Sequence, residues 1–477
     1  MAHDRPAKTR FAPSPTGRLH LGNVRTALFN VLLARRLGGQ FLLRVEDTDA
    51  ERSREEFVAA QCADLEWLGL HWHEGPGRAG EHGPYRQSER SAIYRNYFAA
   101  LEHRGLAYPC FCSELELKMV RKAQLAAGQP PRYPGTCANL SATEVEHRLA
   151  EGIRPTLRFR VPKGQRIAFE DTVRGTQRYL SDEIGDFIIR RADGTSAFFF
   201  CNAVDDALMG VTHVLRGEDH LTNTPRQLML LEALDLPAPS YGHITTIVGG
   251  DGKPLSKRHG ALSLKELREQ GYRPEALINH LARLGHYYSD DALMTLDELA
   301  QRFEFAHLGR APARHDETQL MHWQREAVAR LDTKALLAWA GPALPDVPSE
   351  DRERLLVLVA PNIRFPIDAT EWAAYLLGSE HPIEDDAGEI LATADAELFA
   401  SAASAVRANA PDYQALIAQL KAQGYSGKRL FKPLRAALTG RLHGPELDQI
   451  YAFLGAQRAG ARLERAAALA RDLSSSS

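Results

Sequence analysis

Apolar and polar positions alternate with two different periods near the start of the chain, and these periods predict strands and a helix. Residues 9–12, Thr-Arg-Phe-Ala, form a short expected strand, which two prolines end because proline cannot donate a hydrogen bond to a sheet. Residues 24–37 carry apolar side chains at helical spacing, with Asn23 as the expected N-cap. Residues 41–45 form an apolar run, the second expected strand, that leads into Glu46. Such a strand–helix–strand unit predicts a parallel, doubly wound sheet, which binds ligands at the carboxyl ends of its strands.

The pattern changes again further along the chain. Residues 108–196 mix helical and short β-like runs, and residues 198–234 return to strand–helix alternation. Beyond Gly260 most segments have helical spacing, and the expected helices cover 264–270, 274–284, 391–410 and 460–473. The expected fold class is therefore α/β: a doubly wound parallel sheet with an inserted α+β domain, followed by an all-α C-terminal half.

Composition narrows the class of protein. A chain of 477 residues predicts about two to four domains, and 44% apolar with 25% charged residues is typical of a globular protein. No apolar run is long enough to span a bilayer, and the N-terminus has no apolar signal core, so we expect a cytoplasmic protein. Five cysteines are too few for a disulfide framework.

Charge argues against a protein that coats nucleic acid with its whole surface, since the net charge is −3. The C-terminal stretch 401–477 is nevertheless basic, with eleven Lys and Arg against five Asp and Glu. That excess is compatible with a solvated helical surface or with a local nucleic-acid-binding face.

Two segments carry the candidate chemistry. Residues 11–23 place a stiff turn with Gly17 and Gly22 before the predicted helix, whose free N–H groups suit a phosphate, and His20 lies at the mouth of that helix. Residues 253–260 form a loop that contains Ser256, Lys257 and Arg258, and its cations suit a triphosphate. Taken separately, the first segment is compatible with a turn that contains an incidental histidine, and the second with a solvated basic loop. Together they predict one site that activates an acid with ATP.

In this order and spacing the two segments resemble the signature motifs of class I aminoacyl-tRNA synthetases. Further motifs are similar to those of the bacterial glutamyl-tRNA synthetase family, and the resemblance covers almost the whole chain. They lie at residues 9–17, 45–49, 202–206, 215–219, 271–277 and 430–440.

The resemblance implies a glutamate–tRNA ligase that activates glutamate with ATP to glutamyl-adenylate and transfers it to the 3′ end of tRNA(Glu). ATP would come with Mg²⁺, and the partners would be tRNA, L-glutamate and ATP, with no membrane, for a monomeric enzyme. The implied domains are a Rossmann-like catalytic domain over 1–108 and 197–247, an inserted acceptor-binding domain over 109–196, a stem-contact domain with the basic loop over 248–316, and a helical anticodon-binding domain over 317–477.

The resemblance also implies the role of individual residues. The residues implied to bind ATP are Pro13, Thr16, Gly17, His20, Gly22, Asn23 and Lys257. Those implied to stabilise charge in the transition state are His20 and Lys257, supported by Ser256 and Arg258. Those implied to bind glutamate are Arg10, Ser14, Glu46, Phe198 and Arg216. Within that set the two arginines would clamp the side-chain carboxylate, and Glu46 would hold the ammonium.

The chain departs from the family pattern in several places. Phe198 stands where a tyrosine is common near the amino-acid pocket, and Pro254 stands where the basic loop commonly has its first lysine. The usual motifs are also blurred around 313–316 and 322–324, which suggests a diverged tRNA-facing surface or altered tRNA choice.

Cys110, Cys112 and Cys137 match the spacing of a zinc site found in some family members, but Asn139 occupies the position of the usual fourth ligand. A related shorter family uses a tyrosine and a cysteine as its last two ligands, so Tyr133 could complete the set. A zinc site of Cys110, Cys112, Tyr133 and Cys137 and a metal-free remnant both stay open.

Two other functions also stay open. One is a relative that mainly or additionally charges tRNA(Gln) with glutamate. The other is a non-catalytic tRNA-binding paralogue, which the intact candidate residues argue against.

Overall fold

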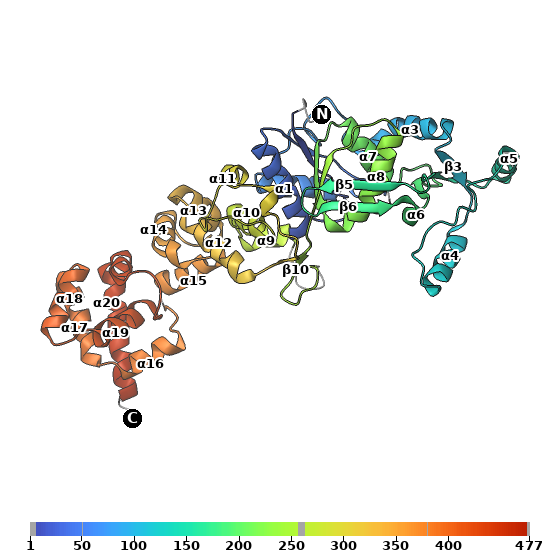
Figure 1. The fold of residues 1–477 in the computed structure, drawn as a ribbon. Helices are drawn as coiled ribbons and strands as arrows, with labels where there is room; N and C mark the ends of the chain where they lie inside the picture. The colour runs from blue at the N-terminus through green and yellow to red at the C-terminus, as the bar shows by residue number, and fades with distance from the viewer. Residues whose placement is uncertain (1–5, 50, 256–262, 379, 475–477) are drawn as a thin grey trace. The chain divides into compact units, whose positions relative to one another are not determined.

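The computed structural model describes residues 6–49, 51–255, 263–378 and 380–474 (Figure 1). The chain divides into two compact units, Met1–Leu267 with Leu277–Gln319 and Arg268–Ala276 with Leu320–Ser477. Within the described ranges, no helix combines the length and the apolarity needed to cross a membrane.

The first unit is built on parallel strands, as the sequence predicts. β1 (Lys8–Phe11) pairs in parallel with β2 (Gln40–Leu43), and β8 (His213–Gly217) pairs in parallel with β9 (Ser240–Ile244). Thr212 donates its backbone N–H to Lys8 O at 2.9 Å, which joins the two pairs side by side.

Helix α1 (Leu21–Arg36) is almost completely buried and ties the sheet together. The Asn30 side chain donates to Leu215 O on β8 at 2.9 Å, while Asn30 O accepts from the Thr9 hydroxyl on β1 at 2.8 Å. The remaining helices of this α/β part are α2 (Glu55–Trp67), α3 (Ser91–His103), α7 (Phe198–Leu208) and α8 (Thr224–Ala233).

The inserted segment contains its own antiparallel sheet. Its strand order is β3 (Ala107–Cys110), β4 (Thr156–Phe159) and β7 (Phe187–Arg190). α4 (Glu114–Ala126) and α5 (Ala142–Ala150) connect the first two strands, and α6 (Ser181–Ile184) is a single turn.

A hairpin within the inserted segment joins the main sheet instead of the antiparallel one. β5 (Arg166–Asp171) pairs with β6 (Gly175–Leu180), and β5 also meets β9 in parallel where Asp171 faces Tyr241. The sequence pattern alone did not predict this attachment.

The rest of the first unit contains short elements. They are β10 (Ile247–Val248), which pairs in parallel with β11 (Ala313–Arg314), and the helix α11 (Leu296–Gln301). The helices α9 (Leu264–Gln270) and α10 (Pro274–Arg283) are divided between the two units, because Arg268–Ala276 belongs to the second.

The second unit is helical, and its core consists mainly of buried leucines and alanines. Its helices are α12 (Glu317–Ala329), α13 (Thr333–Ala340), α14 (Ser349–Val359), α15 (Pro366–Leu377), α16 (Asp385–Thr393), α17 (Ala396–Asn409), α18 (Tyr413–Ala422), α19 (Lys428–Thr439) and α20 (Leu447–Ser474). The expected fold class is thus confirmed.

One local expectation differs from the structure, and the blurred motif at 322–324 is partly buried. The single helix expected over 391–410 is interrupted between α16 and α17, because the Asp395 carboxylate accepts from Glu397 N–H and starts a new helix there. In the motif at 322–324, His322 is exposed, whereas Trp323 and Gln324 are buried. The Gln324 amide donates to Arg364 O at 2.8 Å and accepts from Arg273 N–H at 2.9 Å, so this side chain stabilises the fold. The expectation of a diverged tRNA-facing surface around 313–316 and 322–324 stays a prediction.

Candidate active site

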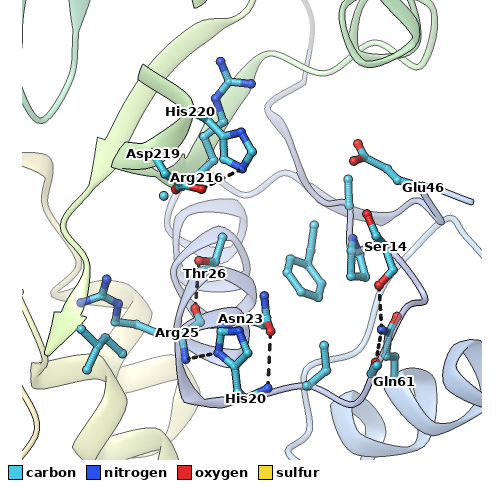
Figure 2. Close-up of a pocket in the computed structure, with 18 of the residues that line it drawn as sticks. Ser14, His20, Asn23, Arg25, Thr26, Glu46, Gln61, Arg216, Asp219 and His220 are labelled. Carbon is cyan, nitrogen blue, oxygen red and sulfur yellow. Dashed lines mark hydrogen bonds and ion pairs between the residues drawn. The ribbon is translucent and has the colours of Figure 1, made fainter. Parts of the chain in front are cut away.

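A cavity of about 820 Å³ opens at the carboxyl ends of β1 and β8 (Figure 2). This is the edge at which a doubly wound sheet binds its ligands. The cavity is lined by every described residue that the sequence assigned to ATP or glutamate: Arg10, Pro13, Ser14, Thr16, Gly17, His20, Gly22, Asn23, Glu46, Phe198 and Arg216.

The N-terminus of α1 opens into this cavity, and His20 caps it. The His20 Nδ1 accepts from Gly22 N–H at 3.2 Å and Asn23 N–H at 3.4 Å, and the Asn23 side chain accepts from His20 N–H at 3.4 Å. The expectation that Asn23 is the N-cap was therefore wrong: the helix begins earlier, and Asn23 is the third residue of a capping box. Because Nδ1 accepts, a neutral His20 carries its proton on Nε2 and can donate with it.

Gly22 is needed for this arrangement. A Cβ on Gly22 would lie 3.1 Å from two atoms of the His20 ring, so a larger residue would crowd the ring and require it to shift by a few tenths of an ångström. Glycine at this position therefore leaves room for the histidine cap.

Gln61, on α2, holds the turn before α1. Its amide donates to Ser14 O at 3.2 Å and Gly17 O at 2.9 Å, as Figure 2 shows. Sequence reasoning missed Gln61, because a single glutamine in an amphipathic helix carries no signal for this contact.

Arg10 and Glu46 belong to a buried and electrically balanced cluster. Arg10 Nε lies 3.2 Å from Asp206 Oδ1. Arg44 connects the two carboxylates, with Nη1 2.8 Å from Asp206 Oδ1 and Nη2 3.4 Å from Glu46 Oε1. The Asn202 amide also donates to Glu46. Burial raises the pKa of Glu46, and the nearby charges of Arg44 and Arg10 oppose that shift.

Arg216, at the end of β8, has only neutral partners among the described residues. Its Nε donates to His243 Nε2 at 3.1 Å, and its Nη2 donates to Thr224 Oγ1 at 2.9 Å and Gln227 Oε1 at 2.7 Å. The buried Nη1 has no hydrogen-bond partner there. Burial lowers the pKa of Arg216 to about 10, which still leaves the group charged at neutral pH. Arg216 is therefore a buried positive charge that an anionic ligand would balance. Arg25, which lines the same cavity and is also buried, likewise donates, among the described residues, only to backbone carbonyls, those of Leu284 and Thr245.

Phe198 begins α7 and stacks on His220, with ring centroids 5.4 Å apart. Burial lowers the pKa of His220 to about 4, although the carboxylate of Asp219 acts in the opposite direction. Asp219 and His220 line the cavity but were not assigned a role from the sequence; their position directly after β8 is the signal that could have found them.

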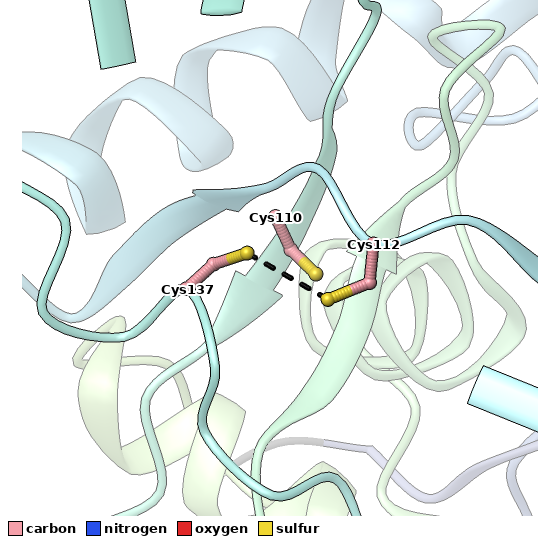
Figure 3. Close-up of side chains that lie close together, drawn as sticks. All are labelled: Cys110, Cys112 and Cys137. Atoms are coloured by element: carbon pink, nitrogen blue, oxygen red, sulfur yellow. Dashed lines mark hydrogen bonds between the residues drawn. The ribbon is translucent and has the colours of Figure 1, made fainter. Parts of the chain in front are cut away.

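The predicted metal ligands lie together in the inserted segment (Figure 3). The sulfur atoms of Cys110, Cys112 and Cys137 all lie within 4.8 Å of one another, and those of Cys112 and Cys137 are 3.7 Å apart. The Tyr133 hydroxyl lies 3.4 Å from Cys110 Sγ and 3.6 Å from Cys112 Sγ. The three thiols and the Tyr133 hydroxyl therefore form one cluster.

The Cys112–Cys137 distance and the two Tyr133 distances are those of a tetrahedral zinc site. Zn–S bonds of about 2.3 Å at tetrahedral angles place two sulfurs about 3.8 Å apart, and a sulfur and an oxygen about 3.6 Å apart. Hydrogen bonds and the Arg158 guanidinium outweigh burial and lower the pKa of Cys110 to about 7. Burial and the neighbouring thiols raise the pKa of Cys112 to about 11, and burial raises that of Tyr133, so without a metal these two groups stay protonated at neutral pH.

The basic loop residues Ser256, Lys257 and Arg258 lie outside the described residues. Pro254 and Leu255, which directly precede them, line the cavity. Leu255 donates its N–H to Ile247 O at 3.1 Å and so fixes the start of this segment beside β10.

A helix N-terminus and a buried arginine at the carboxyl edge of a parallel sheet are typical of α/β proteins that bind a nucleotide or another anionic ligand. The family described as tRNA synthetases class I (E and Q), catalytic domain, matches residues 6–322, and the anticodon binding domain family matches residues 333–467. The chain therefore belongs to the class I tRNA synthetases of the glutamate and glutamine group, as its motifs indicated.

Individual relatives agree with this. The chain is 59% identical to glutamate–tRNA ligase 2 of Nitrosococcus oceani, over 96% of this chain and 97% of the relative. It is 57% identical to glutamate–tRNA ligase 2 of Alkalilimnicola ehrlichii, over 97% and 98% of the two chains. A crystal structure of a glutamate tRNA ligase from Elizabethkingia meningosepticum, in complex with its amino acid, matches with a TM-score of 0.88 at 28% identity, covering 97% of this chain and 99% of the other.

Proposed function

We propose that this enzyme is a glutamate–tRNA ligase that forms glutamyl-adenylate from glutamate and ATP and transfers the glutamyl group to tRNA(Glu). The observation that carries the proposal is the buried Arg216 in the cavity, whose charge has no anionic partner among the described residues. The relatives named above, which match nearly the full length of the chain, support the same reaction.

Glutamate would bind between the balanced cluster and Arg216. The Arg216 Nη1 would receive the side-chain carboxylate, with Arg10 beside it, and Glu46 would hold the ammonium. Ser14 lines the same cavity and supports a further contact to the amino acid. Phe198, stacked on His220, would form an apolar wall without the hydrogen bond that a tyrosine supplies.

ATP would bind at the N-terminus of α1. The helix end and the His20 Nε2–H would face phosphate oxygens, and Thr16, Gly17 and Gly22 would border the nucleotide. Mg²⁺ would accompany ATP through phosphate oxygens. The α-carboxylate of glutamate then attacks the α-phosphate in line and pyrophosphate leaves, a step that needs positioning and charge stabilisation more than acid–base chemistry. Lys257, with Ser256 and Arg258, would stabilise the leaving pyrophosphate.

The acceptor would be tRNA, contacted by the inserted segment and by the helical unit. The basic excess in 401–477 supports phosphate contacts by the helical unit. An enzyme that also or mainly charges tRNA(Gln) remains the alternative, because the residues that read the anticodon are not assigned.

The three thiols and the Tyr133 hydroxyl would hold one structural zinc ion, because the Cys112–Cys137 distance and the two Tyr133 distances match a tetrahedral site. This site would fix the fold of the inserted segment.

Pyrophosphate exchange tests the activation step. Because the family that the motifs resemble generally needs tRNA to activate glutamate, we expect ATP–pyrophosphate exchange only when glutamate and tRNA(Glu) are both present. If no glutamate-dependent exchange occurs with any glutamate or glutamine tRNA, the proposed function is overturned.

A further inference from the structure

A buried chain of three side chains runs away from the cavity behind Arg216. The His243 Nε2 accepts from Arg216 Nε at 3.1 Å, and the His243 Nδ1 lies 2.5 Å from Asp171 Oδ2. The side chains of His243 and Asp171 are both 0% exposed, and neither lines the cavity.

The sheet itself sets up this chain. Arg216 on β8 is the direct neighbour of His243 on β9, and Asp171 ends β5 opposite Tyr241, two residues before His243. Each of the three strands therefore contributes one side chain to this hydrogen-bonded chain: β8 Arg216, β9 His243 and β5 Asp171. Asp171 reaches it only because the β5–β6 hairpin of the inserted segment joins the main sheet.

The geometry fixes the proton on His243. Burial opposes ionisation of Asp171, but the hydrogen bond to His243 and those from the Arg174 and Val173 N–H groups lower its pKa, so it is an anionic acceptor. The Nδ1 of His243 must therefore donate to it, which leaves Nε2 as the acceptor that Arg216 Nε requires.

This arrangement differs from the one at Arg10. Arg10 contacts the Asp206 carboxylate directly, so its charge is balanced within the protein. Arg216 is held by a neutral imidazole, a hydroxyl and an amide, and the acidic group stands one side chain further away. The guanidinium is thus fixed in orientation while its charge stays available to a ligand.

We propose that Asp171 and His243 are positioning residues that set the selection of glutamate over glutamine by orienting Arg216 without neutralising it. The proposal rests on the proposed function, since it assigns the side-chain carboxylate of glutamate to Arg216. Replacing the imidazole by an apolar group would leave the Arg216 Nε without an acceptor. The guanidinium would then be held only by the two hydrogen bonds of Nη2, which fix its orientation less strictly.

The test is steady-state aminoacylation by variants of the full chain with purified tRNA(Glu). His243→Leu removes the acceptor, whereas His243→Gln places an amide oxygen near the position of Nε2 and keeps it. Asp171→Asn lets His243 adopt the wrong tautomer. His213→Gln, on the neighbouring strand and outside the cavity, is the matched control.

We expect His243→Leu to raise KM for glutamate roughly ten- to a hundredfold, from one lost hydrogen bond to a charged group, with KM for ATP unchanged. The inhibition constant of glutamine, which has no charge for Arg216 to bind, should change less than threefold, so selectivity falls. Asp171→Asn should lower the selectivity for glutamate over glutamine in the same way. His243→Gln should keep most of the native selectivity. Unchanged glutamate selectivity in folded variants, or an equal rise in both KM values, would overturn the proposal.

A second measurement does not depend on the folding of any variant. The nitrogen chemical shifts of His243 in the native enzyme should show a protonated Nδ1 and an unprotonated Nε2; the opposite tautomer would contradict the positioning role. Failure of the native enzyme to charge any tRNA would refute the proposed function instead, so the two failures are distinguishable.

Discussion

Replacing Arg216 by methionine tests the electrostatic basis of the site. Arg216 is 4% exposed, and its three hydrogen-bond acceptors are all uncharged, so the substitution removes the positive charge that no described carboxylate balances. The methionine keeps much of the apolar stem, which limits the change in packing.

The magnitude follows from the burial of the site. A unit charge pair about 4 Å apart is worth about 4 kcal/mol at an effective dielectric constant of about 20. Truncating one partner of a buried, hydrogen-bonded charge pair costs about 2–5 kcal/mol in general. A loss of about 3–5 kcal/mol in transition-state stabilisation corresponds to a fall of roughly two-hundred- to five-thousandfold in kcat/KM for glutamate.

The assay is aminoacylation of tRNA(Glu) over a range of glutamate concentrations, with thermal unfolding to confirm that the variant is folded. Arg86→Met is the control, because it removes a bidentate salt bridge to Glu55, at 2.7 Å for both contacts, away from the cavity. Activity of Arg216→Met within tenfold of the native enzyme would refute the claim that this charge binds the substrate.

Three further predictions concern other parts of the chain. His20→Asn keeps a cap acceptor for α1 but removes the Nε2 donor, so the rate of adenylate formation should fall by about a hundred- to a thousandfold with little change in thermal stability; a normal rate would exclude His20 from phosphate stabilisation. Purified enzyme should contain one zinc ion per chain and Cys137→Ser should lose it, whereas native protein without zinc by elemental analysis would end the metal hypothesis. Burial and the nearby charge of His307 lower the pKa of His286 to about 4. As the pH falls, the unfolded chain therefore protonates this imidazole at a higher pH than the folded chain does. The free energy of unfolding decreases as the pH falls below about 6.5. His286→Gln keeps an acceptor for Glu304 N–H, and it should reduce the loss of unfolding free energy between pH 7 and pH 5 by up to about 2 kcal/mol in urea titrations; an unchanged pH dependence would contradict this.

The sequence predicted the parts of the fold that depend on local pattern. The periodicity of α1 and the two flanking strands was strong enough to place the sheet and its carboxyl edge, and the motif residues Arg10, Glu46 and Arg216 do line the cavity there. The extent of helix was also predictable in the second unit, although Asp395 shows that one well-placed capping carboxylate can divide a continuous helical pattern.

The contacts that orient these residues could not be predicted in the same way. Asp171 and His243 are 72 residues apart and meet only because a hairpin from the inserted segment pairs with β9. Gln61 reaches the turn at Ser14 from another helix, 47 residues away. Such pairs depend on the tertiary arrangement, and a single buried histidine or glutamine carries no periodic signal of its partner.

The most direct test of the whole account is charging of purified tRNA(Glu) and tRNA(Gln), side by side, with ATP and either labelled glutamate or labelled glutamine. We predict that glutamyl-tRNA(Glu) accumulates and that glutamine is not incorporated. If glutamate is attached to neither tRNA, or if glutamine is the amino acid attached, the assignment of the cavity to glutamate is contradicted.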